Sequence, residues 1–265
     1  MAERVYPRLI AARLRGQASY RASFALLCVA SALSQLVELA VILVLFNRVD
    51  ALGGFSVDEV VLVYALAGVA FGLADLVAGQ LDELPTHLRT GTFDVLLLRP
   101  LSTLAQVMAS DLHLRKIGRT LASAVVLVYA LVHNDIAWSP LTAPLVLVAP
   151  ISGAVIFSAV WVIAGSICFW LIDGQELANS VTYGSSAFTS YPATVYGPWL
   201  RRFFAFVVPG AFVAYYPALA LLDRPDPLGG PALLGWASPL VAAVTAVVAG
   251  LVWRFAVRHY RGTGS

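Results

Sequence analysis

The chain has 265 residues, of which 60% are hydrophobic and only 12% are charged, and its formal net charge is +2. A soluble globular chain carries about 25% charged residues, so this composition excludes an ordinary soluble domain. Long apolar runs recur along the chain, and about 20 apolar residues cross the hydrocarbon core of a bilayer as a helix. The sequence therefore predicts an all-α, polytopic membrane protein with a single transmembrane domain over residues 1–265.

The basic residues comprise sixteen arginines and one lysine, Lys116. A phosphate-binding loop needs a glycine-rich turn that ends in Gly-Lys-Ser/Thr, and no such turn precedes Lys116. We therefore expect no nucleotide site on this chain. The spans carry no paired catalytic histidines and no serine–lysine arrangement, so no catalytic residue is expected, and no cofactor is expected on this chain. The four histidines lie far apart in the sequence, so no metal site is expected either. Cys28 and Cys168 lie in apolar runs, where buried free thiols are the usual state.

Arginine is frequent in the first segment, residues 1–22. Arg4, Arg8 and Arg15 fall on one helical face, and most of the apolar residues lie opposite. This pattern predicts an interfacial helix on the cytoplasmic leaflet, attracted by anionic lipid. An ordinary positively charged flank without helical structure is the alternative.

Five apolar runs predict membrane spans in chain order. They cover residues 23–46, 57–77, 117–132, 143–172 and 234–255. The stretch 176–222 can be divided in two ways. Hydropathy alone favours a span at 203–222, whereas a polar span at 176–196 leaves 198–222, broken by prolines, to dip into the outer leaflet and return. We prefer the second division, because hydroxyl-rich helices pack well inside a bundle.

The distribution of basic residues orients these spans. With a cytoplasmic N-terminus, the inner segments hold thirteen basic residues and the outer segments hold four. Cytoplasmic loops of membrane proteins carry an excess of Lys and Arg. This asymmetry predicts that both termini are cytoplasmic, and hence an even number of spans. Six spans fit, with the re-entrant hairpin before the last.

Polar residues inside two of the predicted spans are candidates for a translocation path or a subunit interface. In the first span these are Ser34, Gln35 and Glu38, and in the fifth Ser185, Ser186 and Thr189. A carboxylate at membrane depth is costly and is a functional hypothesis by default. A protonated Glu38 that hydrogen-bonds to a neighbouring helix is the plainer alternative.

The longest loop between spans is the cytoplasmic segment 78–119. Connections between helices are usually shorter than ten residues, so this segment is long for a mere link. Its mixed charge and apolar ridge predict a docking element for a cytoplasmic partner, with Pro100 as a break and Ser102 as a helix start. A solvated loop without a partner is the alternative.

Two local patterns resemble signatures of a known family. The sequence Gly91-Thr92-Phe93-Asp94-Val95-Leu96-Leu97-Leu98-Arg99-Pro100-Leu101 is similar to the Gly-x-hydrophobic-Asp-x-x-Leu-x-Arg-Pro-Leu signature of certain bacterial type-2 ABC exporter permeases. The stretches 191–196 and 208–218 resemble the second signature of that subgroup, which often works as paired permeases. The resemblance covers essentially the whole chain. In the topology that this family implies, Arg201 and Arg202 fall on the outer side, against the usual excess of basic residues inside.

The resemblance implies a permease subunit of an ATP-driven exporter in the cell inner membrane. Its partners would be two copies of a separate ATP-binding subunit, which carry the ATP and Mg, and a second permease, a paralogue or a second copy. Membrane lipid is expected around it, and nucleic acid is not. The implied coupling residues are Asp82, Glu83, Arg89, Gly91, Phe93, Asp94, Arg99 and Pro100, and those of an outer gate within 198–222 are Pro209, Tyr215, Tyr216 and Pro217. A proton-coupled secondary carrier that uses Glu38 is the alternative function.

Overall fold

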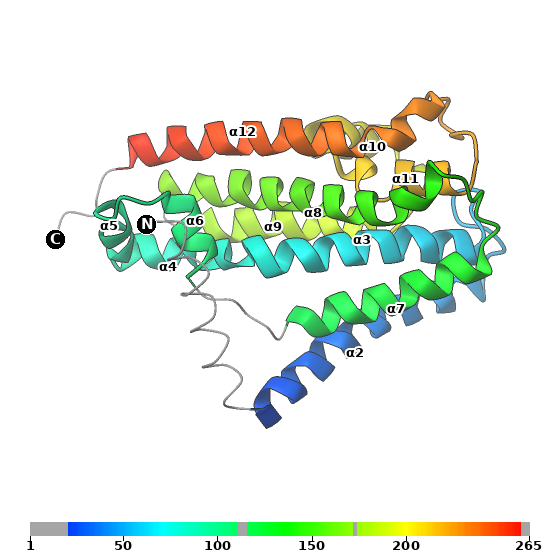
Figure 1. The fold of residues 1–265 in the computed structure, drawn as a ribbon, viewed down its shortest axis with the longest axis horizontal. Coiled ribbons are helices and arrows are strands. Elements are labelled where there is room, and N and C mark those ends of the chain that lie inside the picture. The colour runs from blue at the N-terminus through cyan, green and yellow to red at the C-terminus, as the bar shows by residue number, and fades with distance from the viewer. Residues whose placement is uncertain (1–20, 111–115, 172–173, 261–265) are drawn as a thin grey trace.

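The computed structural model describes residues 21–110, 116–171 and 174–260. The predicted interfacial helix at 1–22 lies almost wholly outside these residues. Within them the chain forms helices joined by turns and no β-strand, so the predicted all-α fold is confirmed. The helices run side by side in an elongated bundle (Figure 1).

Five long helices form this bundle. They are α2 (Arg21–Phe46), α3 (Val57–Ala78), α7 (Ile117–His133), α8 (Thr142–Ser166) and α12 (Ser238–His259). Four of them are long and apolar enough to cross a membrane, and they correspond to the predicted spans 23–46, 57–77, 143–172 and 234–255. Helix α7 is apolar but has only 17 residues. The chain is therefore a multi-pass membrane protein.

Helix α3 lies at the centre of the bundle and is buried along most of its length. Its first turn is closed by a capping box, in which Ser56 and Glu59 bond reciprocally to each other's backbone N–H. Gly68 and Gly72 allow close approach of α7, because a Cβ at either position would collide with Ser123 or Thr120. In lipid the hydrophobic effect does not drive helices together, and the close packing that small residues permit stabilises the contact instead.

Helices α2 and α12 lie at the periphery, and most of their side chains are exposed. The exposed residues of α2 are predominantly Leu and Val, as on the outer faces of α7, α8 and α12. Such faces would be unstable in water but suit the hydrocarbon core of a bilayer. Helix α2 contacts α7 chiefly, whereas α12 packs along α8.

A group of short helices closes one end of the bundle (Figure 1). It consists of η2 (Gly79–Glu83), α4 (Leu84–Arg89), α5 (Thr92–Leu97) and α6 (Thr103–Met108). We call this group the cap. Pro85 stands in the first turn of α4, and Ser102 precedes α6 as the sequence predicts. The C-terminal end of α12 lies at the same end of the bundle.

The stretch 176–222 forms one short helix and one sharply bent segment. Helix α9 (Gly174–Thr189) is followed by η5 (Ala193–Val195) and α10 (Pro198–Arg202). The π-helical turn η6 (Phe203–Val207), η7 (Gly210–Phe212) and α11 (Tyr215–Leu221) follow. We call residues 198–222 the bent segment. Its two arms meet at 70° at Pro209, so residues 203–222 do not form one straight helix. The bent segment and η8 (Ala232–Trp236) lie at the end opposite the cap.

Candidate coupling and translocation sites

The cap is attached to the bundle by a cluster of aromatic side chains. Phe93 of α5 is fully buried, and its ring lies 5.2 Å from Phe169, 5.3 Å from Tyr260 and 6.4 Å from Trp253. Trp253 also donates an Nε1 hydrogen bond of 3.1 Å to Thr103 of the cap. Edge-to-face aromatic pairs add about 0.5–1.5 kcal/mol each beyond the area they bury. The cluster therefore holds α5 against the ends of α8 and α12.

Tyr260 contributes to this cluster as a neutral phenol. Burial, together with the negative charge of the nearby Asp94, raises the pKa of its hydroxyl. The ring thus stays uncharged at neutral pH, which suits an apolar contact. Asp94 itself is exposed on α5.

The backbone of the cap is shaped by one glycine and by local hydrogen bonds. Gly91 has φ +69°, in the left-handed region that favours glycine, and it separates α4 from α5. Thr92 Oγ1 lies 2.9 Å from His87 Nδ1 across this turn. Gln106 donates from Nε2 to the carbonyl oxygens of Leu96 and Leu101, which closes the link between α5 and α6.

The exposed surface of the cap carries apolar side chains. Leu98 is 84% exposed, Val95 51% and Leu97 43%. Other exposed residues of the cap among the predicted coupling set are Glu83, Arg89, Asp94, Arg99 and Pro100. We call these eight residues the contact face. Exposed apolar residues rimmed by charges are typical of protein–protein interaction sites.

Asp82 behaves differently from the other predicted coupling residues, because its carboxylate is engaged within the bundle. Trp161 Nε1 of α8 donates to Oδ1 at 2.7 Å, and the Tyr183 hydroxyl of α9 donates to Oδ2 at 3.1 Å. Gln175 of α9 donates to the backbone carbonyl of Asp82 at 3.3 Å. Asp82 thus connects η2 of the cap with two helices of the bundle.

The polar residues of α2 lie beside polar residues of α3 and α7. Gln35 is almost fully buried and exchanges hydrogen bonds with Tyr64, while Arg119 donates from Nε to Gln35 Oε1 at 2.8 Å. A terminal nitrogen of Arg119 lies 3.4 Å from Glu38, whose side chain is half exposed. The charge of Glu38 is therefore balanced by a neighbouring helix. Ser34 is exposed and bonds to the carbonyl of Ala30 in its own helix.

The predicted polar residues of α9 mostly bond within that helix. Ser185 donates to the carbonyl of Val181 and Thr189 to that of Ser186, and both Ser185 and Thr189 are buried. Glu38 instead lines a cavity of about 130 Å³ together with Tyr64 of α3 and with Ser190 and Tyr191, the two residues just after α9. The first polar set thus reaches the C-terminal end of α9 through Ser190 and Tyr191, which are not among the predicted path residues, and not through Ser185, Ser186 or Thr189.

An ion pair at the cap end of the bundle was not anticipated from the sequence. Lys116 Nζ lies 2.6 Å from Asp75 Oδ1, and the two side chains are only 17% and 10% exposed. A Cβ at position 79 would collide with both groups, so Gly79 leaves the space they occupy. The sequence shows that Lys116 and Arg119 stand at the start of an apolar run, but it does not show what they contact. Asp75, the partner of Lys116, is 41 residues away in sequence, and Gln35, the partner of Arg119, is 84 residues away.

We expect Lys116→Met to destabilise the protein by about 3 kcal/mol, because it leaves the Asp75 carboxylate largely buried without its cation. Thermal unfolding in detergent measures the effect as a lower midpoint. Asp75→Asn in the same chain removes the orphaned charge and should restore most of the loss. A double variant as unstable as Lys116→Met would contradict this account.

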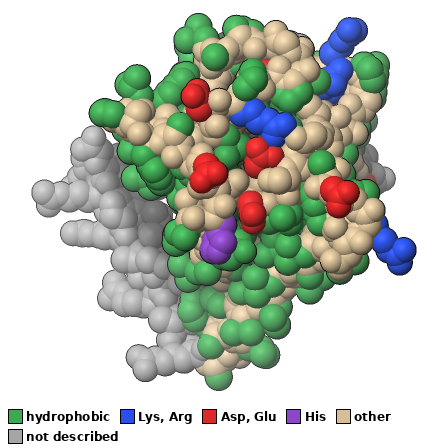
Figure 2. Space-filling view, turned by 90° about the vertical axis from the view of Figure 1, so that its right-hand side faces the viewer, with side chains coloured by type: hydrophobic (Ala, Val, Ile, Leu, Met, Phe, Trp, Pro, Cys, Tyr) green, Lys and Arg blue, Asp and Glu red, His purple; other side chains and the backbone are tan. Residues whose placement is uncertain are grey.

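Charged and aromatic residues gather at the end opposite the cap. Figure 2 shows carboxylates and arginines on this face, in contrast to the apolar flanks. Arg224 binds both carboxylate oxygens of Glu59 at 2.7 Å, which joins the loop after α11 to the start of α3. The Tyr215 hydroxyl donates to Asp226 at 2.6 Å. These bonds hold the loops at this end of the bundle together.

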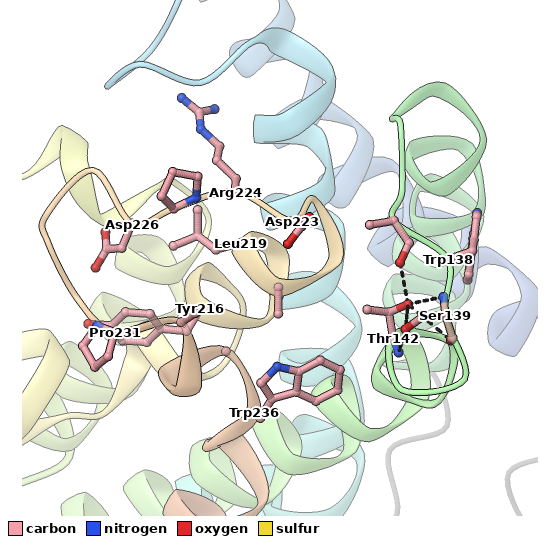
Figure 3. A pocket seen from close by; sticks show the side chains of 15 residues that line it. Trp138, Ser139, Thr142, Tyr216, Leu219, Asp223, Arg224, Asp226, Pro231 and Trp236 are labelled. Carbon is pink, nitrogen blue, oxygen red and sulfur yellow. Dashed lines mark hydrogen bonds between the residues drawn. The ribbon is translucent and has the colours of Figure 1, made fainter.

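The predicted gate residues occupy the bent segment. Pro209 stands at the bend, whereas Tyr215, Tyr216 and Pro217 are buried in the first turn of α11. A cavity of about 600 Å³ lies beside them, between α11, the start of α8 and η8 (Figure 3). Tyr216 and Trp236 are among the residues that line it. Whether these residues form a gate stays a prediction.

Neither a curated protein sequence nor a solved structure matches this chain significantly. A sequence model of the ABC-2 family transporter proteins, in contrast, matches residues 32–264. The match begins within α2 and spans the other long helices, the cap and the bent segment, so the family-level resemblance found in the sequence is confirmed. Membership implies a membrane component of a transporter rather than an ATPase. The chain belongs to the ABC-2 family of transporter proteins.

Proposed function

We propose that the chain is the membrane subunit of an ATP-driven exporter. It would work with two copies of a separate ATP-binding subunit, which hold ATP and Mg, and with a second permease that is a paralogue or a second copy. The structure of the cap is the main support for this proposal. It is anchored in the bundle through the buried Phe93, and its exposed residues form the contact face. A helical group built in this way can bind a partner and pass its movement to the bundle.

The proposed topology has six spans, formed by α2, α3, α7, α8, α9 and α12, with the bent segment 198–222 as a re-entrant hairpin. Helices α7 and α9 have 17 and 16 residues and reach only about 25 Å, short of the 30 Å of a typical hydrocarbon core. Short spans are accommodated by local thinning of the bilayer and by flanking residues. The excess of basic residues on the cap side supports a cytoplasmic cap, cytoplasmic termini and an inner-membrane location.

The proposed translocation path lies where two permeases meet, lined by polar residues of α2 and α9. Helix α2 supports this placement because most of its surface is unoccupied within one chain, while Glu38 is half exposed. The exposed stripe of α9, which includes Ser180, Tyr183 and Gly184, is equally available. A second permease would cover both.

Co-purification tests the proposal. The tagged chain is expressed in its native host, extracted in mild detergent, and its bound proteins are identified by mass spectrometry. We expect a soluble ATP-binding subunit, together with a second permease if the assembly is heteromeric. Recovery of the chain alone, from a host that also contains its candidate ATP-binding partner, would refute it.

The alternative function, a proton-coupled carrier, depends on Glu38. The neighbouring Arg119 gives Glu38 a structural partner, which favours a role in holding α2 to α7. We expect Glu38→Gln to leave ATP hydrolysis by the purified complex within about twofold of the parent, since the charged contact of Glu38 is with α7 rather than with the cap. Proton movement in liposomes that requires Glu38 and no ATP would instead establish the carrier.

A further inference from the structure

The carboxylate of Asp82 is placed where a movement of the cap would reach the bundle. Asp82 lies within η2 of the cap, and its carboxylate accepts hydrogen bonds from Trp161 of α8 and Tyr183 of α9. Hydrogen bonds to a charged acceptor are roughly twice as strong as neutral ones. Tyr183 lies on the exposed stripe of α9, so this bond connects the cap with the face that we assign to the path.

Aromatic stacking holds the donors of these bonds in place. Trp161 stacks on Phe71 of α3, with ring centroids 5.2 Å apart and planes inclined by 27°. Tyr183 meets Trp161 edge to face at 5.9 Å. Trp161 and Phe71 are buried, whereas Tyr183 is not. We therefore regard helix α8 as the support, because its Trp161 is packed on α3, whereas Tyr183 belongs to the less enclosed helix.

The far end of α9 is attached to the bent segment. Phe188 is buried and stacks with two rings, Tyr196 at 4.4 Å between ring centroids and Phe204 at 4.3 Å, with planes inclined by 30° and 14°. Gly210 lies close to Thr189 and Phe188, where a Cβ would press on the Thr189 methyl group. A displacement of α9 along its axis would therefore act directly on residues 196–210.

We propose that Asp82 and Tyr183 are positioning residues that transmit movement of the cap through α9 to the bent segment at the opposite end. Asp82 follows the cap, Tyr183 ties α9 to Asp82, and Phe188 passes the displacement to Phe204. Coupling between distant sites requires a packed element whose position both sites bias, and α9 has contacts at both of its ends. The inference rests on the proposed ATP-driven function, because it needs a partner that moves the cap.

The test measures movement at the end opposite the cap. Val195→Cys and Leu141→Cys, both exposed positions, carry spin labels in a chain whose Cys28 and Cys168 are replaced by Ala. The complex with its ATP-binding subunit is placed in lipid nanodiscs, and the distance between labels is measured by pulsed electron resonance with and without ATP and vanadate. Residue 195 follows α9, whereas residue 141 precedes α8, the proposed support.

In the parent we expect ATP and vanadate to shift this distance. Tyr183→Phe removes only the hydroxyl, and Asp82→Asn removes one of the two acceptor oxygens. Each should reduce the shift by more than half while the complex stays assembled and hydrolyses ATP. Tyr129→Phe, the same change at an exposed position of α7, is the matched control and should keep the full shift.

The outcomes separate the two proposals. A parent that shows no shift with an ATP-binding subunit bound would count against the ATP-driven function itself. A parent that shifts, with Tyr183→Phe and Asp82→Asn shifting equally, would overturn the role of α9. Loss of the ATP-binding subunit from the Tyr183→Phe complex would also overturn it, because the residue would then support docking rather than transmission.

Discussion

Replacing Leu98 and Val95 by Asp should release the ATP-binding subunit from the purified complex. Both side chains are exposed on the contact face, and a carboxylate cannot be desolvated cheaply in an apolar interface. Central interface residues cost about 2 kcal/mol or more when they are lost, which lowers affinity about thirtyfold. The amount of ATP-binding subunit recovered per tagged chain measures the effect, and ATP hydrolysis by the preparation should fall with it.

Because both residues are exposed, the double variant should insert and unfold like the parent. Leu233→Asp, at an equally exposed leucine at the other end of the bundle, is the matched control and should leave the bound subunit in place. An unchanged yield of the subunit with Leu98→Asp and Val95→Asp would place the interface elsewhere. Reduced recovery with Leu233→Asp as well would mean that the charge acts through folding.

The long apolar spans could be predicted from the sequence, because one physical requirement dominates them. A helix in lipid needs a continuous apolar surface, so the ends of the spans at 23–46 and 57–77 can be predicted from where the apolar runs begin and end. The stretch 176–222 lacks that signal. Its limits depend on the bend at Pro209 and on contacts such as that between Phe188 and Phe204, which composition does not encode.

The candidate coupling residues were found by resemblance, but their orientation could not be predicted. Phe93 and Asp82 point into the bundle, while Leu98 and Arg99 point outward. The partners of Asp82 lie 79 and 101 residues further along the chain, and only the packing of α8 and α9 brings them together. The polar residues of α2 were visible as a stripe, yet the role of Arg119 in balancing Glu38 depends on α7.

The residues of the cap that point into the bundle and those that are exposed are expected to have different roles. We expect substitutions on the contact face to change what binds, and substitutions at Phe93 and Asp82, whose side chains contact the bundle, to change how the cap is held. Gly91 belongs to neither, since its left-handed conformation sets the angle between α4 and α5. A loss of function at Phe93 or Asp82 therefore does not by itself locate the partner's surface.

Phe93→Ala should detach the cap from the bundle. The side chain is fully buried among Phe169, Trp253 and Tyr260, and truncating a buried Phe to Ala costs about 3–5 kcal/mol. We expect faster hydrogen–deuterium exchange over residues 92–108, with little change in α3, because the cap shares few of the core contacts of that helix. Phe93→Leu keeps part of the apolar volume and should give an intermediate rate.

Phe255→Ala is the matched control, because it removes the same atoms from an exposed position of α12 one turn from the cluster. Exchange over 92–108 should stay as slow in this variant as in the parent. Equal exchange in Phe93→Ala and the parent would show that the cap is held by other contacts, with the hydrogen bonds of Asp82 as the next candidate. Faster exchange throughout α3 would mean instead that the cap and the bundle unfold as one unit, and the cap could then transmit no movement of its own.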